Sequence, residues 1–395
     1  MRRIAANYIF PITSDPIHNG YVDFTDDGTV AATGILESET AGTEFYNGIL
    51  VPGFTNAHCH IELSHLEGKF REATGMSGFI DQINALRESA PKEQRQAAMR
   101  KQFDKMYREG VSAMADISNC DESFAMKSGA PMYTRTFIEV FGSEPQDAGA
   151  VIDNARKVLE KAGEAGIDAG ITPHSPYTMS AELLRMASAE GLKAGYISYH
   201  NQESQEEDDM IGMHCGPLYE NYARRHLSIV PATGKPAIFH FLDRLQEIHP
   251  FPIDEHILLI HNTVSREDSI RAAESALKNC TWVTCPLSNI FIHRTMADLP
   301  LLMKMGVRIA VGTDSLSSNH VLSMVEEIKC IHSRYPQIPL QTILQWSCLN
   351  GAAAIGKDRE LGSFEPGKKP GAVLIDSIDF SGMHLTPESK SRRII

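Results

Sequence analysis

Strand-length apolar runs alternate with amphipathic helical patterns along most of this chain of 395 residues. After a first run that ends near Phe54, the others lie at 111–117, 132–140, 168–172, 193–199, 257–260, 282–284 and 307–311. Apolar residues at helical spacing lie between them, at 79–108 with a break at Pro91, 148–165, 181–190, 266–277, 299–305 and 321–334. Nearly continuous apolar runs are typical of parallel strands that are buried on both faces. Eight strand-then-helix units predict an α/β fold, a (β/α)8 TIM barrel, and no Gly-x-Gly-x-x-Gly turn favours the alternative, a doubly wound open sheet.

The two ends of the chain have a different pattern, with short β runs around turn residues at 8–10, 20–24, 26–30 and 372–376. We expect these ends to form a small β-sandwich, with residues 1–50 as its N-terminal part and 357–395 as its C-terminal part. Residues 51–356 between them are expected to form a metal-dependent barrel. The segment 204–251 is longer than an ordinary strand–helix connection. It can shape a substrate pocket or form a contact between copies of the chain, so a homo-oligomer is left open.

Composition narrows the class of partner. The formal net charge of −13 argues against nucleic acid, and no apolar run approaches the ~20 residues that a membrane span needs. The start of the chain is too polar, and too soon interrupted by Pro11, for a signal peptide. Seven scattered cysteines without a Cys-x-x-Cys pair are typical of reduced thiols. We therefore expect a cytoplasmic protein whose partner is a small-molecule substrate.

Residues able to bind a metal ion or move protons follow several of the predicted strands. His58 and His60 end the first, and on an extended chain alternate side chains share a face. His200, His261 and Asp314 end the fifth, sixth and eighth. A single buried histidine is usually structural, but several unpaired imidazoles and carboxylates are costly to bury without a function. Because the chemistry of such a barrel lies at the carboxyl ends of its strands, the set indicates a catalytic metal centre.

Four motifs resemble those of the amidohydrolase superfamily: Pro52-Gly53-Phe54-x-Asn56-x-His58-x-His60, His200-x-x-Glu203, Cys285-Pro286-Leu287-Ser288-Asn289 and Gly312-Thr313-Asp314-Ser315. They are most similar to the mononuclear aminohydrolase branch, which includes guanine, adenosylhomocysteine and aminodeoxyfutalosine deaminases. The resemblance implies a (β/α)8 barrel with a small β-sandwich. It also implies one divalent metal ion, Zn²⁺ or alternatively Fe²⁺, held by His58, His60, His200 and Asp314. Relatives that bind two metal ions bridge them with a carboxylated lysine at the end of the fourth strand. Residues 171–177, which occupy that place here, contain no lysine, and this favours a single ion.

The same resemblance implies roles for further residues. A metal ion lowers the pKa of bound water toward ~7, and Asp314 would take the proton that water loses. His261 would hold the nucleophile and stabilise charge on the tetrahedral adduct. Glu203, placed one helical turn past His200, would protonate a ring nitrogen of the substrate and later the departing ammonia. His174 would face the substrate, or else cap a loop.

Two further residues are expected at the substrate pocket. Arg135 on the third strand is expected either to grip an anionic group of the substrate or to pair with Glu139 inside the barrel. Ser288, within the Cys285–Asn289 motif, is expected at the pocket wall. The resulting hypothesis is a hydrolytic deaminase of an aminopurine nucleoside-like substrate, 6-aminodeoxyfutalosine or an adenosine derivative. The alternatives are a hydrolase that releases chloride or a formimino group at the same site, and a non-catalytic scaffold protein related to dihydropyrimidinases.

Overall fold

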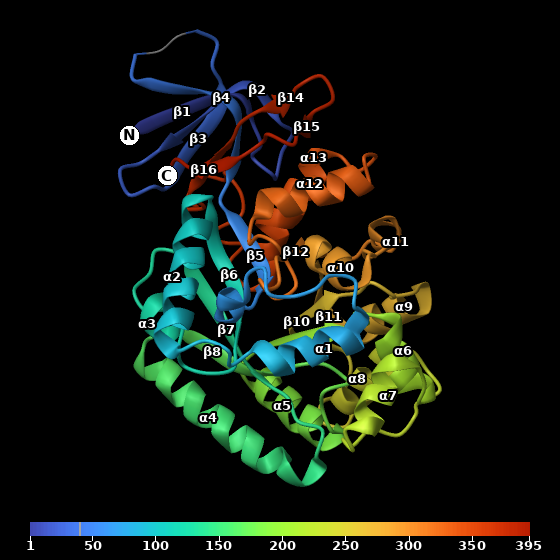
Figure 1. The fold of residues 1–395 in the computed structure, drawn as a ribbon. Coiled ribbons are helices and arrows are strands. Elements are labelled where there is room, and N and C mark those ends of the chain that lie inside the picture. The colour runs from blue at the N-terminus through green and yellow to red at the C-terminus, as the bar shows by residue number, and fades with distance from the viewer. Residues whose placement is uncertain (39–40) are drawn as a thin grey trace.

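The computed structural model of the protein describes residues 1–38 and 41–395, so Glu39 and Thr40 of the predicted N-terminal part lie outside the described residues. Eight parallel strands form two four-stranded sheets, and Figure 1 shows them surrounded by helices. The first sheet contains β5 (Phe54–Cys59), β6 (Val111–Ser118), β7 (Tyr133–Val140) and β8 (Asp168–Pro173). The second contains β9 (Tyr196–Asn201), β10 (Ile253–His261), β11 (Leu277–Thr284) and β12 (Ile309–Val311).

Backbone hydrogen bonds close the two sheets into one barrel. At the seam between β8 and β9, the N–H of His200 donates to the carbonyl of His174 over 2.8 Å. At the other seam, Cys59 and Asp314 form a parallel bridge, and the N–H of Asp314 donates to the carbonyl of His58 over 3.0 Å. The predicted (β/α)8 barrel is therefore confirmed. Both seams lie at residues that the sequence marked as chemically important.

Helices follow the strands in the predicted alternation. They are α1 (Gly75–Leu86), α2 (Lys92–Arg108), α3 (Phe124–Lys127), α4 (Ala148–Glu164), α5 (Ala181–Lys193), α6 (Gln205–Met213), α7 (Gly216–Arg224), α8 (Ala237–Gln246), α9 (Glu267–Ala276), α10 (Pro286–His293), α11 (Leu299–Lys304), α12 (Met324–Arg334), α13 (Leu340–Gln345) and α14 (Gly351–Ala354). Pro91 separates α1 from α2 as expected. The strand predicted from residue 193 begins only at Tyr196, because α5 continues to Lys193 and Gly195 then turns the chain with φ +82°. No helix in the described ranges is both long and apolar enough to cross a bilayer.

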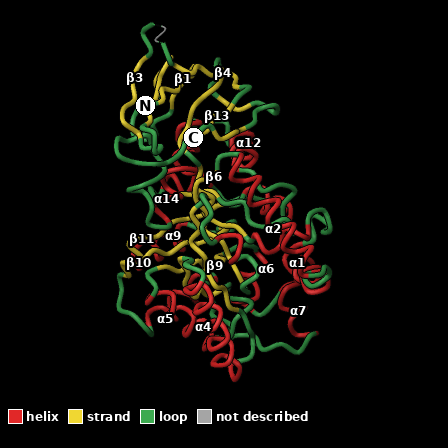
Figure 2. Tube along the Cα trace, turned by 90° about the vertical axis from the view of Figure 1, so that its left-hand side faces the viewer, coloured by secondary structure: helices red, strands yellow, loops and turns green. Residues whose placement is uncertain are grey.

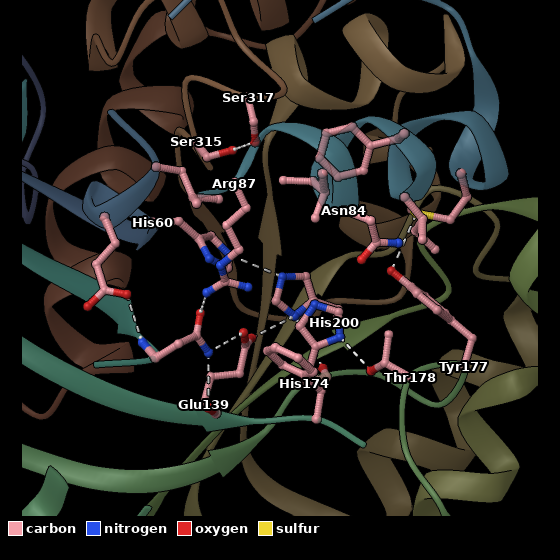
Figure 3. A pocket seen from close by; sticks show the side chains of 18 of the residues that line it. His60, Asn84, Arg87, Glu139, His174, Tyr177, Thr178, His200, Ser315 and Ser317 are labelled. Atoms are coloured by element: carbon pink, nitrogen blue, oxygen red, sulfur yellow. Dashed lines mark hydrogen bonds and ion pairs between the residues drawn. The ribbon is translucent and has the colours of Figure 1, made fainter. Parts of the chain in front are cut away.

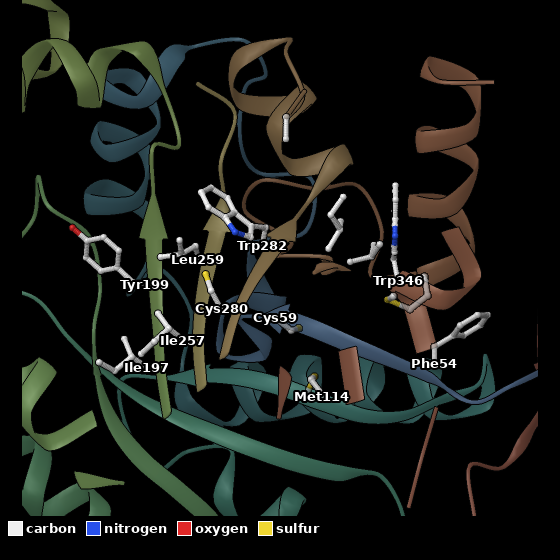
Figure 4. Close-up of a cluster of buried hydrophobic side chains, with 14 of the residues drawn as sticks. Phe54, Cys59, Met114, Ile197, Tyr199, Ile257, Leu259, Cys280, Trp282 and Trp346 are labelled. Atoms are coloured by element: carbon white, nitrogen blue, oxygen red, sulfur yellow. The ribbon is translucent and has the colours of Figure 1, made fainter. Parts of the chain in front are cut away.

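The barrel strands bury side chains on both faces, which explains their nearly continuous apolar runs. On β10, Ile257 and Leu259 join the large layer between strands and helices, whereas Leu258 and Ile260 join a smaller cluster inside the barrel. Figure 4 shows part of the outer layer, where Trp282 lies close to Leu259. This packing on both faces holds the strand ends in fixed positions.

Strands from both chain ends form a separate mixed sheet, seen beyond one end of the barrel in Figures 1 and 2. Its order is β16 (Ser391–Arg393), β13 (Ala372–Ile375), β4 (Thr43–Pro52), β1 (Arg2–Ile9), β2 (Ile17–Phe24) and β3 (Val30–Ile35). A two-stranded hairpin, β14 (Ile378–Asp379) with β15 (His384–Leu385), completes the C-terminal part. The predicted strand at 26–30 is instead a turn that leads into β3.

The apolar run from Gly48 to Phe54 passes from this terminal sheet into the barrel. It ends β4 at Pro52 and begins β5 at Phe54. At Gly53, between the two strands, a Cβ atom would overlap the hydroxyl of Ser112 and the carbonyl of Pro370. Only glycine therefore fits where the chain enters the barrel wall.

Candidate metal and active site

Three histidines and one carboxylate from the ends of β5, β9 and β12 converge at the carboxyl end of the barrel. The Nε2 atom of His60 lies 3.1 Å from that of His58 and 3.3 Å from that of His200. The Oδ1 atom of Asp314 lies 3.8 Å from His58 Nε2 and 3.7 Å from His60 Nε2. The ligand atoms of the three histidines all lie within 4.8 Å of one another. The structure thus brings together the four residues that the sequence predicted as metal ligands.

The chemistry of these donors fits a metal ion. Burial lowers the pKa of His60 and of His200 to about 3 each. It also lowers the pKa of His58 well below its usual value. At His58 and His200, neighbouring imidazoles lower the pKa further. All three rings are therefore neutral, which is the state that binds metal. The Nδ1 atom of His200 faces the carbonyl of His174 at 3.2 Å, which places the proton on Nδ1 and leaves Nε2 free as a ligand. Three imidazoles with a carboxylate match the ligands that Zn²⁺ accepts.

The carboxylate of Asp314 is oriented by two serines. Its Oδ2 atom accepts hydrogen bonds from Ser288 Oγ at 2.6 Å and from Ser318 Oγ at 2.8 Å. Asp314 also has a left-handed backbone, with φ +56°, which turns the chain directly after β12. Ser288 was predicted to line the substrate pocket, but its hydroxyl is fully buried and is occupied by Asp314 and Ser318. The structure therefore places Ser288 behind the carboxylate and not at the pocket wall.

Glu203 lies beside the metal site, in the loop between β9 and α6. The predicted helical turn from His200 to Glu203 does not exist, because α6 begins at Gln205. A left-handed Gln202, with φ +45°, turns the chain there, and the N–H of Glu203 donates to the buried carboxylate of Glu207 over 2.8 Å. The side chain of Glu203 nevertheless faces the site. Its Oε2 atom accepts a hydrogen bond from Tyr177 at 3.1 Å.

His261, the last residue of β10, faces Glu203. Its Nε2 atom lies 3.5 Å from Oε1 of Glu203, and its Nδ1 atom accepts from the side-chain amide of Asn289 at 2.9 Å. Burial lowers the pKa of His261 well below its usual value, so the ring is neutral with its proton on Nε2. Burial first, and then the charge of Asp314, raise the pKa of Glu203 to about 8. The site therefore presents a carboxylic acid at neutral pH next to a neutral imidazole donor.

His174 lines the same cavity, stacked on His200 with ring centroids 4.4 Å apart. Its Nδ1 atom contacts the hydroxyls of Ser175 and Thr178, each at 2.8 Å, which leaves Nε2 for another partner. His174, His200 and Glu139 form a second group of metal-ligand types within 4.8 Å. That group shares His200, whose Nδ1 proton already faces a backbone carbonyl, so it is not an independent metal site.

Arg135 lies far from this chemistry, and both sequence expectations for it are wrong. It comes early in β7, and its guanidinium forms an ion pair with Asp168 and covers the ring of Tyr196 at 4.1 Å. Its side chain is 6% exposed, and it does not line the cavity. Arg135, Phe137 and Glu139 are alternate residues of β7, so their side chains share one face of the strand. They lie in successive layers inside the barrel. Arg135 is therefore at the amino end, too far from Glu139 to pair with it.

The cavity above the metal ligands has a volume of about 760 Å³. Figure 3 shows Arg87, Glu139, His174 and Tyr177 around it, together with His60 and His200. An apolar wall comes from α1 and from residues outside it: Met76, Phe79, Ile80, Ile83, Phe141, Tyr222 and Leu227. The last two belong to the predicted excursion at 204–251, which forms α6, α7 and α8 and does shape the pocket.

Arg87, Asn119 and Tyr177 contact the cavity or the candidate site residues without having been predicted to do so, and the contact of Asn289 with His261 was not predicted either. Tyr177 lies three positions after His174, and Asn289 follows Ser288 in the Cys285–Asn289 motif. Their nearness in sequence to candidate site residues was therefore a usable signal. Arg87 follows an ordinary amphipathic helix, and nothing in its neighbourhood distinguishes it from a solvated surface residue. Only the position of α1 above the barrel brings it into the cavity.

A closed barrel with three imidazoles and a carboxylate at the carboxyl ends of its strands has the architecture of a metal-dependent hydrolase. The chain belongs to the amidohydrolase family, whose family model matches residues 49–391. This confirms the resemblance that the sequence motifs indicated.

The similar proteins include several deaminases. The aminodeoxyfutalosine deaminase of Deinococcus radiodurans is 26% identical over 331 residues, which are 80% of this chain and 75% of that protein. The crystal structure of the Helicobacter pylori aminofutalosine deaminase in complex with methylthio-coformycin matches with a TM-score of 0.81 and 22% identity over the whole of both chains. An adenosine deaminase from Xanthomonas campestris with bound zinc matches with a TM-score of 0.74 and 20% identity, over 95% of this chain and 84% of that one. These two structural matches show that the fold is shared.

Proposed function

We propose that this protein is a metal-dependent hydrolytic deaminase that releases ammonia from an aminopurine nucleoside-like substrate, such as 6-aminodeoxyfutalosine or another adenosine derivative. The observation that carries the proposal is the position of Glu203. This buried acid lies 3.5 Å from His261 and faces the same cavity as the His58, His60 and His200 group. Deamination of an aminopurine needs both an activated water and a proton donor, and this site supplies a place for each.

The metal ligands would be His58, His60, His200 and Asp314, with Zn²⁺ as the first choice and Fe²⁺ as the alternative. A metal ion bound there would supply a Lewis acid that makes water acidic near neutral pH. Asp314 would accept the proton that the attacking water loses, since its Oδ1 faces the histidines while two serines hold Oδ2.

Glu203 would then donate its proton to a ring nitrogen next to the carbon that carries the amino group, which makes that carbon a better electrophile. The Nε2–H of His261 has no hydrogen-bond partner among the described residues, and it would stabilise negative charge on the oxygen that adds to the ring. When ammonia leaves, it would take the proton held by Asp314, and the ionised Glu203 would take the proton of the added hydroxyl, which becomes the carbonyl oxygen and restores both carboxyl groups. His174 would orient the purine through its free Nε2.

The size and lining of the cavity support a nucleoside in preference to a free base. A cavity of about 760 Å³ is in the range that encloses drug-sized ligands. Three of the metal ligands, together with Glu203 and His261, form one polar region of its lining, while α1 and the 204–251 segment add apolar side chains elsewhere. We expect a purine ring at the polar end and its substituents along the apolar wall.

The decisive experiment is ammonia release by the zinc-loaded protein from adenine, adenosine, 5′-methylthioadenosine, S-adenosylhomocysteine and 6-aminodeoxyfutalosine. We expect turnover of at least one nucleoside, and loss of that turnover with a chelator. No ammonia from the whole panel, with release of chloride from a chlorotriazine or of a formimino group, would replace the proposal by another hydrolysis at the same site. A metal content below about half an ion per chain without chelator-sensitive activity would favour the non-catalytic scaffold.

A further inference from the structure

The cavity contains one arginine near the metal ligands that the proposed reaction does not use. Arg87 follows the last residue of α1, is half-buried, and lines the cavity next to His60 in Figure 3. Its Nη2 atom donates to the side-chain oxygen of the neutral Asn119 over 2.6 Å. In the described ranges, no carboxylate forms an ion pair with Arg87. Its positive charge therefore has no direct counter-charge in the protein.

Two other arginines of the barrel have carboxylate partners. Arg95 lines the same cavity, but it forms ion pairs with Glu122 and with Glu88. Arg135, deep in the barrel, forms an ion pair with Asp168. Burying a guanidinium without a counter-charge is costly, so an arginine kept in this state usually has an external partner.

The position of Arg87 is set by neighbours that leave most of its donors free. Its backbone carbonyl contacts His65 Nε2 at 2.8 Å, which anchors the end of α1. Asn119 cannot turn its amide away, because its Nδ2 donates to the carbonyl oxygen of Glu139 at 3.0 Å and to Oε2 of the same residue at 3.3 Å. Asn119 therefore accepts from Arg87 and separates it from the carboxylate of Glu139. A guanidinium has five N–H donors, and the described contacts use one.

The other groups around Arg87 define the surface that a ligand would meet. Glu139 lines the cavity, its side chain is 3% exposed, and its Oε1 atom lies 3.6 Å from Nδ1 of His200, so this carboxyl faces the metal ligands. Phe141, whose ring lies 5.6 Å from the Arg87 guanidinium and is exposed in the cavity, supplies an apolar surface beside these polar groups. A donor-rich cation and an aromatic ring therefore lie side by side in the cavity, and Asn119 separates the cation from the carboxyl of Glu139.

We propose that Arg87 binds an anionic group of the substrate, a carboxylate or a phosphate, and so selects nucleosides that carry such a group over neutral ones. Arginine pairs with both anions through two parallel hydrogen bonds, and the pairing is strengthened where water is partly excluded. This inference rests on the proposed deaminase function and specifies its substrate class. Arg87 would thus perform the anion binding that sequence analysis assigned to Arg135.

The test compares substrates that differ only in charge. Ammonia release is measured for 6-aminodeoxyfutalosine and its neutral methyl ester, and for adenosine-5′-carboxylate and its methyl ester, with adenosine 5′-monophosphate against adenosine as the phosphate pair. Each pair is assayed with the zinc-loaded wild type and with Arg87→Met, Arg87→Lys and Arg225→Met. Arg225 is a matched control, because it is an exposed arginine at the rim of the same cavity.

We expect the wild type to favour the acid over its ester by about tenfold or more in kcat/KM, mainly through KM. Arg87→Met should remove that preference while ester turnover stays within about threefold, Arg87→Lys should restore part of it, and Arg225→Met should leave it intact. A larger preference in the phosphate pair than in the carboxylate pairs would identify phosphate as the anion. Equal use of acid and ester by the wild type, or an unchanged preference in Arg87→Met, would overturn the inference and leave the deaminase proposal standing.

If no nucleoside is deaminated, the proposed function fails. The role of Arg87 is then tested separately, by measuring whether the protein binds small anions. Benzoate and inorganic phosphate are titrated calorimetrically into zinc-loaded wild type and Arg87→Met. An affinity for one of them that falls about tenfold in the variant supports an anion site. Equal affinities in the two proteins would overturn it.

Discussion

The hydroxyl of Ser288 donates a hydrogen bond to Oδ2 of Asp314 over 2.6 Å, so the carboxylate is held with Oδ1 toward His58 and His60. The two residues are 26 positions apart, one at the start of α10 and the other after β12. This contact makes Ser288 a positioning residue for a metal ligand. It also explains why a serine that has no access to the cavity belongs to the functional site.

Ser288→Ala should therefore weaken metal binding and turnover together. Losing a short hydrogen bond to a charged group costs about 1.5–3 kcal/mol, and such outer contacts typically change metal affinity 10–100-fold. Competition with a zinc chelator measures the affinity. Ser188→Ala is the control, since Ser188 is also a fully buried serine but its Oγ has no partner in the described residues and lies outside the site. Equal affinities for wild type and Ser288→Ala would show that Ser318 alone orients Asp314.

Glu203→Gln should separate metal binding from chemistry. The amide keeps the shape of the side chain but cannot donate the proton that we assign to Glu203. We expect full metal content and a fall in kcat of about 10²–10⁴. Elemental analysis and single-turnover ammonia release check the two parts. Glu274→Gln is the matched control, because Glu274 lies on α9 and only accepts a hydrogen bond from Trp282. A near-normal rate for Glu203→Gln would remove this residue from the mechanism.

The raised pKa of Glu203 predicts the direction of the pH profile. Burial and the charge of Asp314 raise this pKa to about 8, so the carboxyl is protonated below that pH and ionised above it. Because the proposed reaction uses the protonated form, kcat should fall as the pH rises through about 8. The profile of Glu203→Gln should lack that alkaline decline in its residual rate. A rate that instead increases through this range would assign Glu203 the role of a base.

Asp314→Asn should remove a ligand and a proton acceptor in one step. The amide retains an oxygen but loses the charge that attracts a divalent cation, so we expect both metal content and activity to decrease strongly. Added zinc should restore occupancy more readily than activity, because the amide cannot take the proton from water. Full recovery of activity at high zinc would show that Asp314 acts as a ligand only.

Arg135→Met should change stability and not catalysis. Arg135 pairs with Asp168 and covers Tyr196 at the amino end of the barrel, away from the cavity. Losing a partner of this pair should cost about 1–3 kcal/mol in the free energy of unfolding. Denaturant unfolding measures that change, and kcat/KM should remain within about twofold of the wild type. A selective increase in KM would restore the earlier expectation that Arg135 contacts the substrate.

Much of the site follows from local pattern. The apolar runs predict where the strands end, and the barrel rule then predicts that His58, His60, His200, His261 and Asp314 meet at one end. Neither step needs knowledge of how helices pack. Glu203 lies at the cavity, although its backbone forms a loop and not the expected helical turn, and its catalytic role stays a prediction.

The sequence by itself therefore determined the barrel, the joining of both chain ends in a separate sheet, and the residues that meet around the proposed metal. The tertiary structure alone decided which arginine lies beside the metal ligands, which oxygen of Asp314 receives Ser288, and how the 204–251 segment covers the pocket. The physical reason is that strand ends are set by neighbours in the chain, whereas these contacts depend on the placement of α1, α7 and α10 over the barrel. That placement is fixed by contacts such as the carboxylate of Glu206 on the N–H groups of Met76 and Ser77, which join segments about 130 residues apart.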